Sequence, residues 1–419
     1  MDLDLVVIGL GYVGLPLALE ACRAGMAVAG LDLSDKVITG LTSGRSHVDD
    51  LSDSDIAEML SSGFEATQDA TVLSRSRAVV ICVPTPLSPD GGPDLTAVRA
   101  ATSMVAKQLR KGQLIVLEST TYPGTTDGEV LPVLEAGGLR CGDDFHLAFS
   151  PERIDPGNDQ YGMKNTPKVV GGCDAASTEA AVEMYGRFVD EVVPVRSARE
   201  AEMAKLLENT YRHINIALMN EMARFCHDMD IDIWEVIRAA ATKPFGFQAF
   251  YPGPGVGGHC IPIDPNYLAH TVRVRLGYSF RFVELAQEIN AGMPSYVALR
   301  AQEILNDDGL AVRGAQILLL GVTYKANIAD DRESPAVPVA RALARLGAAV
   351  SYADPYVTEW RAASDGFPRE DNPTERAGSY DLVILLQPHQ GFDLQQIAGN
   401  SRRYFDTRGA TRSDRAVRL

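Results

Sequence analysis

Cysteine is scarce in this chain and lacks any recognisable pairing. Only six of the 419 residues are cysteines, at Cys22, Cys82, Cys141, Cys173, Cys226 and Cys260. None forms a Cys-x-x-Cys pair, and no nearby cysteine or histidine has the spacing of a zinc site. Scattered cysteines in a chain of this size are typical of reduced thiols. We therefore predict a cytoplasmic protein without a bound metal.

Positive charge is also in short supply. The chain has 39 lysines and arginines against 55 aspartates and glutamates, which gives a net charge of −16. Such a balance argues against nucleic acids and anionic membranes as partners. A small anionic ligand remains possible, because a few local basic residues can outweigh the mean field.

Long apolar runs are absent too. The uncharged stretch from Leu5 to Leu19 is too short and too rich in glycine to span a membrane. Asp2 and Asp4 precede it, whereas a signal peptide begins with basic residues. We predict no membrane segment and no secretion signal, and we expect the polar stretch 361–379 to be a surface loop.

What the N-terminus does contain is a nucleotide-binding pattern. The apolar run Leu5–Ile8 leads into Gly9, Gly11 and Gly14, in the spacing G-x-G-x-x-G, and a helical stretch follows. A second apolar strand then ends at Asp32, whose carboxylate can accept hydrogen bonds from a ribose 2′-hydroxyl and would repel a 2′-phosphate. Strand, helix, strand and terminal acid in this order predict an NAD site. The alternative is a tightly packed glycine turn without a ligand.

Polar residues follow the next predicted strands. The strand ending at Val83 leads into Pro84 and Thr85, and the strand ending at Leu117 leads into Ser119 and Thr120. A further strand ends near Ser150 and leads into Pro151-Glu152-Arg153. Ligands of doubly wound sheets bind at the carboxyl ends of the strands, so these residues are candidates for one site.

A long helix is predicted from about Arg199 to His227, because apolar residues recur there at steps of three and four. Lys205 and Asn209 are four residues apart and therefore share one face of this helix. Its apolar side requires a partner. We predict a subunit interface, and the alternative is an interdomain helix within one monomer.

A second nucleotide-type unit lies near the C-terminus. The buried-strand run Gln316–Leu320 ends at Gly321, and a polar loop with Tyr324, Lys325 and Arg332 follows. Ser334-Pro335 is a suitable N-cap and first residue for the next helix, whose N-terminus can bind phosphate. The fingerprint glycines are missing here, so this unit need not bind NAD. The cations have an alternative role in ion pairs with Asp330, Asp331 and Glu333.

Cys260 closes the glycine-rich run Gly253-Pro254-Gly255-Val256-Gly257-Gly258-His259 and precedes Ile261-Pro262-Ile263-Asp264-Pro265. We predict that it lies where a loop enters a helix, so that the helix dipole favours its thiolate. A buried structural thiol is the alternative. A thiolate is needed when an aldehyde must be oxidised further, because it forms a thiohemiacetal and then a thioester. Lys205 can stabilise the oxyanions, and Asp264 can activate water, position Lys205 or cap the helix.

The runs GLGYVG, VPTP, STTYPGTT, SPER, KLLENTYR, GPGVGGHCIPIDP and GVTYKANIADDRESP resemble the UDP-glucose/GDP-mannose dehydrogenase family over nearly the whole chain. The resemblance implies an α/β protein with two Rossmann-like, doubly wound domains joined by a long central helix and a helical dimerisation region. It implies an NAD-binding domain at 1–196, a dimer-forming region with the cysteine loop at 197–300 and a nucleotide-sugar domain at 301–419. The implied reaction oxidises the C6 hydroxymethyl of a nucleotide sugar to a carboxylate with two NAD per turnover.

The resemblance also implies roles for individual residues. Cys260 is the nucleophile, Lys205 and Asn209 stabilise the oxyanion, Asp264 assists the water or the lysine, and Glu152 handles protons or water beside Thr120. The implied NAD contacts are Gly9, Gly11, Tyr12, Val13, Gly14, Asp32, Pro84, Thr85, Ser119, Thr120 and Arg332. The implied substrate contacts are Glu152, Arg153, Lys205, Asn209, Phe250, Tyr251, Gly255, Gly257, Gly258, Tyr324 and Lys325.

Four positions depart from the glucose-type enzymes of the family. Pro156 replaces a second glutamate, His259-Cys260-Ile261 replaces Ser-Cys-Phe, and Gln248 stands where a sugar-binding arginine is expected. These features look more like UDP-N-acetylglucosamine-type 6-dehydrogenases. The base of the first oxidation is therefore open between Glu152, Lys205 and an ordered water, and His259 is expected to pack the loop.

Two other functions remain open at this point. A two-electron hydroxyacid or sugar-phosphate dehydrogenase of related architecture would turn over without Cys260. A non-catalytic nucleotide sensor would bind NAD and nucleotide without producing NADH. UDP is the family's commonest carrier, and TDP is a further possibility.

Overall fold

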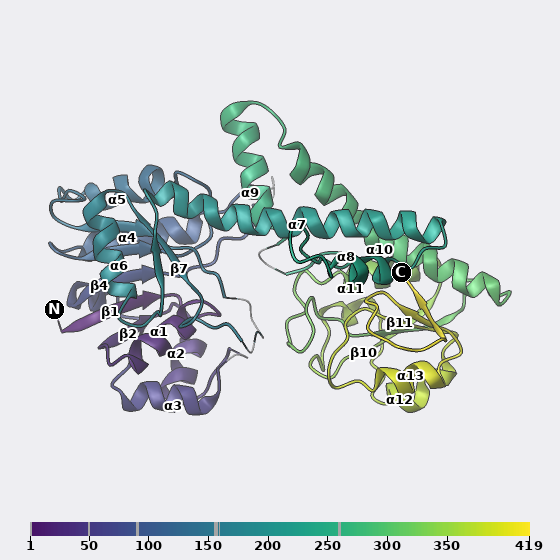
Figure 1. Cartoon of the computed structure of the whole chain (residues 1–419). Coiled ribbons are helices and arrows are strands. Elements are labelled where there is room, and N and C mark those ends of the chain that lie inside the picture. Colours follow the sequence, from purple (N-terminus) through teal and green to yellow (C-terminus); the bar gives the residue numbers. More distant parts are fainter. Residues whose placement is uncertain (1, 49–50, 89–91, 155–157, 159, 259–260) are drawn as a thin grey trace. The chain divides into compact units, whose positions relative to one another are not determined.

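A computed structural model describes residues 2–48, 51–88, 92–154, 158, 160–258 and 261–419 (Figure 1). By its internal contacts the chain divides into two units. The first comprises Met1–Glu208 with Asn266–Leu276, and the second comprises Asn209–Pro265 with Gly277–Leu419. The long helix α7 (Ala198–Asp228) contributes residues to both. It matches the helix that the apolar spacing predicts.

The first unit is built on an eight-stranded sheet with the order β3-β2-β1-β4-β5-β6-β7-β8. All neighbouring strands are parallel except β6 and β7. The strands are β1 (Leu3–Ile8), β2 (Val28–Leu31), β3 (Glu65–Thr67), β4 (Ser76–Ile81), β5 (Leu114–Leu117), β6 (His146–Phe149), β7 (Lys168–Gly172) and β8 (Val192–Pro194). Successive strands are added to one side of β1 up to β3, and then to its other side from β4 onward. Doubly wound sheets bind ligands at such a switch point.

Helices cover both faces of this sheet. They include α1 (Gly14–Arg23), α2 (Asp35–Thr42), α3 (Asp53–Ser61), α4 (Thr96–Gln108), α5 (Leu131–Glu135) and α6 (Ala175–Tyr185). The residues of helix α9 (Asp264–Thr271) are divided between the two units. Successive residues of β1 enter different clusters: Leu5 and Val7 pack into one, and Val6 and Ile8 into the other. Burial on both faces explains why the strands read as continuous apolar runs. Each such side chain contributes about 1.5–3 kcal/mol of burial free energy.

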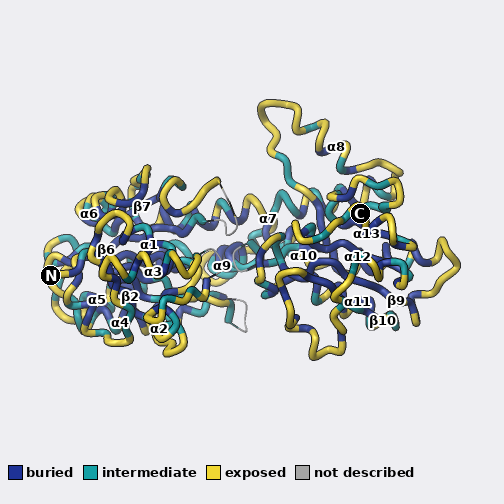
Figure 2. The backbone as a smooth tube through the Cα atoms, turned by 90° about the horizontal axis from the view of Figure 1, so that it is seen from below, coloured by how far each residue is buried: buried dark blue, intermediate teal, exposed yellow. Residues whose placement is uncertain are grey.

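The second unit contains a five-stranded parallel sheet with the order β10-β9-β11-β12-β13. Its strands are β9 (Gln316–Leu320), β10 (Ala349–Ala353), β11 (Leu382–Leu385), β12 (Tyr404–Asp406) and β13 (Ala416–Arg418). Its helices include α8 (Ile233–Ala240), α10 (Arg281–Asp307), α11 (Ala336–Arg345), α12 (Pro373–Arg376) and α13 (Leu394–Asn400). The strands β11 and β12 are buried throughout, whereas residues 241–248 after α8 are exposed (Figure 2).

The predicted fold class, two Rossmann-like α/β units with a long helix between them in the sequence, is confirmed. Two local predictions need correction. Helix α11 begins at Ala336, with Pro335 rather than Ser334 at the N-cap, although the Ser334 hydroxyl does accept from the Ala336 N–H at 3.2 Å.

None of the described helices is long and apolar enough to cross a lipid bilayer.

The stretch 361–379 lies mostly at the surface, as its polar composition predicts, but it is not an irregular loop. It contains α12 and two 3₁₀ turns, Arg361–Asp365 and Ala377–Ser379. Ala362, Phe367 and Ala377 are buried in it. The reason is aromatic packing, because the Trp360 ring lies 5.7 Å from that of Phe367.

A buried carboxylate on α7 holds the loop that follows β5. Glu202 is fully buried and accepts hydrogen bonds from the N–H groups of Gly124 and Thr126, at 2.6 and 2.8 Å, and from the Thr126 hydroxyl at 2.7 Å. Burial raises the pKa of Glu202 to about 7, against the opposing effect of these donors. The carboxylate thereby fixes the end of the loop that starts with Ser119 and Thr120.

This raised pKa predicts a pH-dependent stability. A carboxyl whose pKa rises on folding stabilises the folded state below the unfolded value of 4.5, and the contribution is lost as the pH rises through about 7. The wild type should therefore lose about 3 kcal/mol of unfolding free energy relative to Glu202→Gln between pH ~4.5 and pH ~8. Urea unfolding of both proteins across this range measures the difference.

Glu200→Gln on the same helix is the control, because Glu200 is exposed and a hydrogen bond from Ser197 lowers its pKa. It should follow the wild type between pH ~5 and pH ~8. A constant difference between the wild type and Glu202→Gln across the range would contradict the prediction.

Candidate functional site

The glycine turn after β1 is shaped by close backbone packing. A Cβ on Gly9, which has φ +90°, would lie 2.5 Å from the Cys82 carbonyl oxygen. A Cβ on Gly14 would lie 2.0 Å from the Gly9 oxygen. Packing therefore requires these two glycines. Gly11 differs, because no atom lies within 4 Å of the position that a Cβ would take and the residue is exposed.

Asp32 stands at the end of β2 beside this turn. Its Oδ2 accepts from the Leu10 N–H at 2.9 Å, and its Oδ1 accepts from the Ser34 N–H at 2.8 Å. The carboxylate is half-buried and keeps lone pairs for a ribose hydroxyl. Tyr12 is exposed and Val13 is the N-cap residue of α1. The open Gly11, the helix N-terminus and the fixed carboxylate fit a dinucleotide such as NAD.

The ends of β4 and β5 lie next to each other in the same sheet. The buried Ser119 hydroxyl donates to the Val83 carbonyl at 2.7 Å, and the Thr85 carbonyl accepts from the Tyr267 hydroxyl. Thr120 is half-buried, and Pro84 is exposed. The structure thus gathers the predicted cofactor residues of the first unit at one edge of its sheet.

Glu152 and Lys205 are brought together within the first unit. Both are buried, and the Lys205 ammonium donates to the Glu152 carbonyl oxygen. Arg153 is engaged elsewhere, because its guanidinium donates to the Pro167 carbonyl at 2.6 Å and pairs with Glu208 at 2.9 Å. Arg153 therefore anchors the strand connection as well as being a predicted substrate contact.

In the second unit, Asn209 is paired with Asp264. The Asn209 Nδ2 donates to the Asp264 Oδ2 at 2.5 Å, and both side chains are buried. Asp264 occupies the first turn of α9. His259, the predicted nucleophile Cys260 and Pro156 lie outside the described residues.

The glycine-rich loop lies against the polar loop after β9. A Cβ on Gly257 would lie 2.6 Å from the Glu333 carbonyl oxygen, and one on Gly258 would lie 2.9 Å from the Tyr324 ring. A Cβ on Gly255 would lie 3.0 Å from the Pro335 ring. Two segments about seventy residues apart in the sequence thus form one surface, because only glycine permits so close an approach. Lys325 and Arg332 belong to the same polar loop, and Arg332 is paired with Asp330 at 2.7 Å.

Aromatic side chains flank the start of the glycine-rich loop. The Phe250 ring contacts that of Tyr211 edge-on at 5.5 Å, and the Tyr251 ring stacks on that of Trp234 at 6.1 Å. The Tyr211 hydroxyl donates to the Gln248 amide oxygen at 3.1 Å. Gln248, the position that departs from the glucose-type enzymes, is therefore held by a hydrogen bond.

Two charged residues that contact predicted site segments, Arg408 and Lys168, are not part of any motif in the sequence. Arg408 faces the glycine-rich loop, since its Nη1 lies 2.6 Å from the position of a Cβ on Gly253. Burial lowers the pKa of Arg408 to about 10, and its Nε donates to the Leu386 carbonyl at 2.8 Å. Lys168 is buried beside Glu152, with its Nζ 3.7 Å from the Glu152 Oε2. No local pattern could have revealed either residue, because their partners are distant in the sequence.

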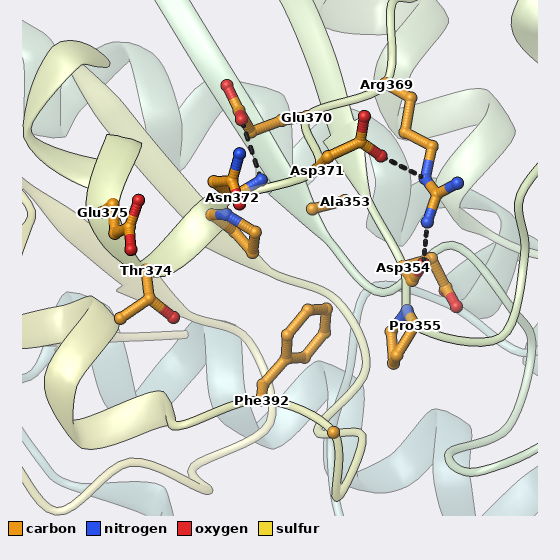
Figure 3. A pocket seen from close by; sticks show the side chains of 12 residues that line it. Ala353, Asp354, Pro355, Arg369, Glu370, Asp371, Asn372, Thr374, Glu375 and Phe392 are labelled. Atoms are coloured by element: carbon orange, nitrogen blue, oxygen red, sulfur yellow. Dashed lines mark hydrogen bonds and ion pairs between the residues drawn. The ribbon is translucent and has the colours of Figure 1, made fainter.

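A cavity of about 340 Å³ opens at the end of β10 (Figure 3). Arg369 lies at its edge, paired with Asp371 at 3.4 Å. Asp354 corresponds in position to Asp32, but its carboxylate accepts from the Val322 N–H at 2.7 Å and contacts the His389 Nε2 at 3.1 Å. None of the predicted site residues lines this cavity. Among the described residues, no group of three His, Cys, Asp or Glu side chains could hold a metal ion.

Comparisons with known proteins agree with this arrangement. Residues 3–189, 199–292 and 318–413 match the NAD binding, central and UDP binding domains of the UDP-glucose/GDP-mannose dehydrogenase family. A UDP-N-acetyl-D-glucosamine 6-dehydrogenase from Pseudomonas aeruginosa is 36% identical over 93% of this chain and 92% of the relative. A UDP-N-acetyl-D-mannosamine dehydrogenase from Pyrococcus horikoshii is 36% identical over 93% of this chain and 90% of the relative.

A solved structure of UDP-D-ManNAc dehydrogenase from Pyrococcus horikoshii superimposes with a TM-score of 0.89 at 32% identity. The match covers 99% of this chain and 97% of that one. The resemblance that the sequence motifs indicate is thus supported along the whole chain.

The open space at Gly11 predicts a substitution that affects cofactor binding without affecting folding. Gly11→Ala adds a methyl group that meets no protein atom, but it stands where a pyrophosphate must approach the backbone. We expect the variant to unfold at the wild-type temperature and to bind NAD about tenfold or more weakly, which is ~1.4 kcal/mol. Fluorescence titration and thermal unfolding measure the two properties.

Gly137→Ala is the matched control, because Gly137 is also exposed with no atom near its Cβ position. It should bind NAD like the wild type. Unchanged NAD affinity of Gly11→Ala would show that the dinucleotide does not use this turn.

Proposed function

Because the chain belongs to the UDP-glucose/GDP-mannose dehydrogenase family, we propose that it oxidises the C6 hydroxymethyl of a nucleotide sugar to a carboxylate. The family is NAD-dependent, and the first unit contains the NAD binding domain. The observation that carries the proposal is the contact of Gly257 and Gly258 with the Tyr324 loop, which builds a surface for a diphosphate sugar in the second unit. Lys325 and Arg408 supply positive charge for the diphosphate.

The proposed sugar carries an acetamido group at C2. The relatives named above act on UDP-N-acetylhexosamines, as their names state. Gln248, hydrogen-bonded to Tyr211, replaces the arginine of the glucose-type enzymes. A neutral amide suits an amide-bearing substituent better than a guanidinium does, because an amide both donates and accepts hydrogen bonds. We propose UDP as the nucleotide that carries the sugar. A preference for TDP-sugars would appear in the substrate panel described below.

When bound, NAD supplies the hydride acceptor of each oxidation. In the first oxidation the C6 hydroxyl loses its proton to a base while its carbon loses a hydride, which gives an aldehyde. We propose that the Lys205 ammonium and the Asn209 amide stabilise the negative oxygen. The Glu152 carbonyl holds Lys205, and the Asp264 carboxylate holds Asn209, so both donors are oriented before substrate binds.

The second oxidation requires Cys260 in this proposal. Its thiolate adds to the aldehyde carbon, and the resulting thiohemiacetal loses a hydride and becomes a thioester. Water then attacks the thioester, which releases the carboxylate and returns the thiol. Asp264 is proposed to position Lys205 or the water in this step.

The number of NADH molecules formed per sugar tests the proposal. The wild type should form two NADH for each nucleotide sugar consumed, with a uronic acid as product. Cys260→Ser should form no acid and at most one NADH per sugar, because the thioester cannot form. Absorbance of NADH and mass spectrometry of the product measure both, over a panel of UDP- and TDP-sugars with and without the acetamido group.

Cys141→Ser is the control, because Cys141 belongs to the first unit rather than to the glycine-rich loop, with its sulfur 3.7 Å from the Ser177 hydroxyl. It should retain the two-to-one stoichiometry. One NADH with a carbonyl product in the wild type would identify the two-electron dehydrogenase instead. NAD and nucleotide binding without NADH from any sugar of the panel would identify a sensor.

We further propose that the protein is a homodimer formed through α7. Tyr211, Leu218 and Phe225 are seven residues apart on this helix and are 45%, 46% and 53% exposed. Residues spaced by sevens share one helix face, so they form an apolar stripe. A second copy of the chain would cover it. The cytoplasmic location remains a prediction that rests on the scattered cysteines.

Leu218→Glu should weaken the dimer, because it places a charge in the middle of the stripe. Light scattering of the purified protein over a dilution series should show a monomer at concentrations where the wild type is dimeric. Leu310→Glu is the control, because Leu310 is 40% exposed and lies outside α7. A wild-type monomer at all concentrations would favour the interdomain-helix alternative.

A further inference from the structure

His389 is a buried histidine in the loop that follows β11. It is 1% exposed and lies four residues after Leu385, the last residue of that strand. Its ring lies between those of Tyr356, at 5.0 Å, and Phe392, at 5.8 Å. The residue belongs to none of the motifs that predict the site. A buried polar ring needs hydrogen-bond partners, so its partners indicate what it does.

The hydrogen bonds of His389 determine where its ring proton lies. Nδ1 lies 2.9 Å from the backbone nitrogen of Asn327, whose N–H can only donate, so Nδ1 is the acceptor. The ring proton is therefore on Nε2, which lies 3.1 Å from the Asp354 Oδ2 and 3.2 Å from the Thr323 hydroxyl oxygen. The ring thus joins the carboxylate at the end of β10 to the residues that follow β9.

Asp354 fixes the orientation of this ring. Its Oδ2 also accepts from the Val322 N–H at 2.7 Å, and its Oδ1 accepts from the N–H groups of Tyr356 and Val357 at 2.8 and 3.0 Å. Burial alone would raise the pKa of Asp354, but the hydrogen bonds from His389 and the backbone hold it below its ordinary value. The carboxylate is therefore an ionised acceptor held in one place, and it directs the Nε2–H of His389.

Two predicted substrate contacts lie in the segment that His389 holds. We call residues 323–327 the β9 loop, and it contains Tyr324 and Lys325. The Thr323 hydroxyl, which contacts the His389 Nε2, donates to the Lys325 carbonyl at 2.6 Å. The position of the β9 loop therefore determines where both predicted contacts lie.

Asn327 ends the β9 loop in a conformation that its neighbours hold in place. Its φ is +65°, in the left-handed region that favours glycine. Its N–H donates to His389, and its Oδ1 accepts from the Gln390 N–H at 2.8 Å. The Gln387 amide adds a hydrogen bond to the Tyr324 carbonyl at 2.7 Å. Residues 387–390 thus hold the β9 loop at several points, and His389 is itself fixed by a carboxylate.

We propose that His389 is a positioning residue for the nucleotide sugar, which holds the β9 loop so that Tyr324 and Lys325 meet the ligand. The proposal rests on the proposed function, because that function assigns the diphosphate to Lys325. In the first unit the corresponding carboxylate, Asp32, keeps lone pairs for a ribose. In the second unit the ring of His389 takes up that accepting capacity, and the aspartate serves the loop instead.

Substitutions at His389 separate the roles of its two ring nitrogens. His389→Leu removes both, so the Kd of UDP and the KM of the nucleotide sugar should rise about tenfold or more, with kcat changed less than twofold. His389→Asn places an amide oxygen near the position of Nδ1, where it can accept from Asn327, and should restore most of the affinity. His389→Gln reaches toward Asp354 instead and should bind UDP as weakly as His389→Leu. Isothermal titration calorimetry and steady-state kinetics measure these constants.

Ser401→Ala is the matched control, because it removes another buried hydrogen bond of the second unit, from the Ser401 hydroxyl to the Ile397 carbonyl at 2.7 Å. It should lower the unfolding temperature and leave the Kd of UDP unchanged. Equal losses of UDP affinity in His389→Asn and His389→Gln would overturn the proposal, because the bond to Asn327 would then not matter. Circular dichroism identifies variants that fail to fold, and the comparison of His389→Asn with His389→Gln decides the matter if His389→Leu is one of them.

Hydrogen–deuterium exchange separates this proposal from the proposed function, because it needs no ligand. Mass spectrometry of peptides that cover the β9 loop should show its amides exchanging about tenfold faster in His389→Leu than in the wild type, and at nearly the wild-type rate in His389→Asn. If the wild type oxidises a nucleotide sugar but exchange, Kd and KM are all unchanged in His389→Leu, the positioning role is wrong and the function stands. If exchange responds as stated but no nucleotide sugar of the panel is oxidised, the function is wrong and His389 stands as the residue that holds the loop.

Discussion

Burial of strands on both faces governs this molecule. The central strands of each sheet are enclosed by helices on either side, so their side chains are almost all aliphatic. Polar groups are displaced to the carboxyl ends, where Asp32, Ser119, Glu152 and Lys325 emerge from different strands. The parallel arrangement then places the residues of each unit along one edge. The polar side chains that the buried strands exclude are thereby concentrated where a ligand can reach them.

The two units share one hydrogen-bond arrangement, in which a backbone N–H after the first strand donates to an aspartate, but they differ in what else that aspartate contacts. Leu10 and Val322, each directly after a glycine, donate an N–H to the carboxylate at the end of the neighbouring strand. Asp32 retains accepting capacity beside the open Gly11, whereas Asp354 is closed by His389. The same fold can thus serve a dinucleotide in one unit and leave the other to bind its ligand through the loop after β9.

Local sequence predicts local structure well in this chain. Apolar runs located the strands, glycine spacing located the first turn, and the periodicity of α7 gave its limits within a residue or so. The short helical turns of the stretch 361–379 were not predicted, because its few apolar residues are anchored by Trp360, which lies just before it. The Gly253–Arg408 contact and the Lys168–Glu152 contact had no local signal, since each joins residues that only the folded sheet brings together. The roles of the individual site residues remain predictions.

The pair formed by Asn209 and Asp264 has a consequence for side-chain entropy. A carboxamide is planar, so fixing one of its N–H bonds also fixes the direction of the other. The hydrogen bond to Asp264 therefore restricts the Asn209 side chain to one rotamer. Immobilising such a side chain costs up to about 2 kcal/mol. Here that loss occurs once, when the chain folds, and does not recur each time a substrate arrives.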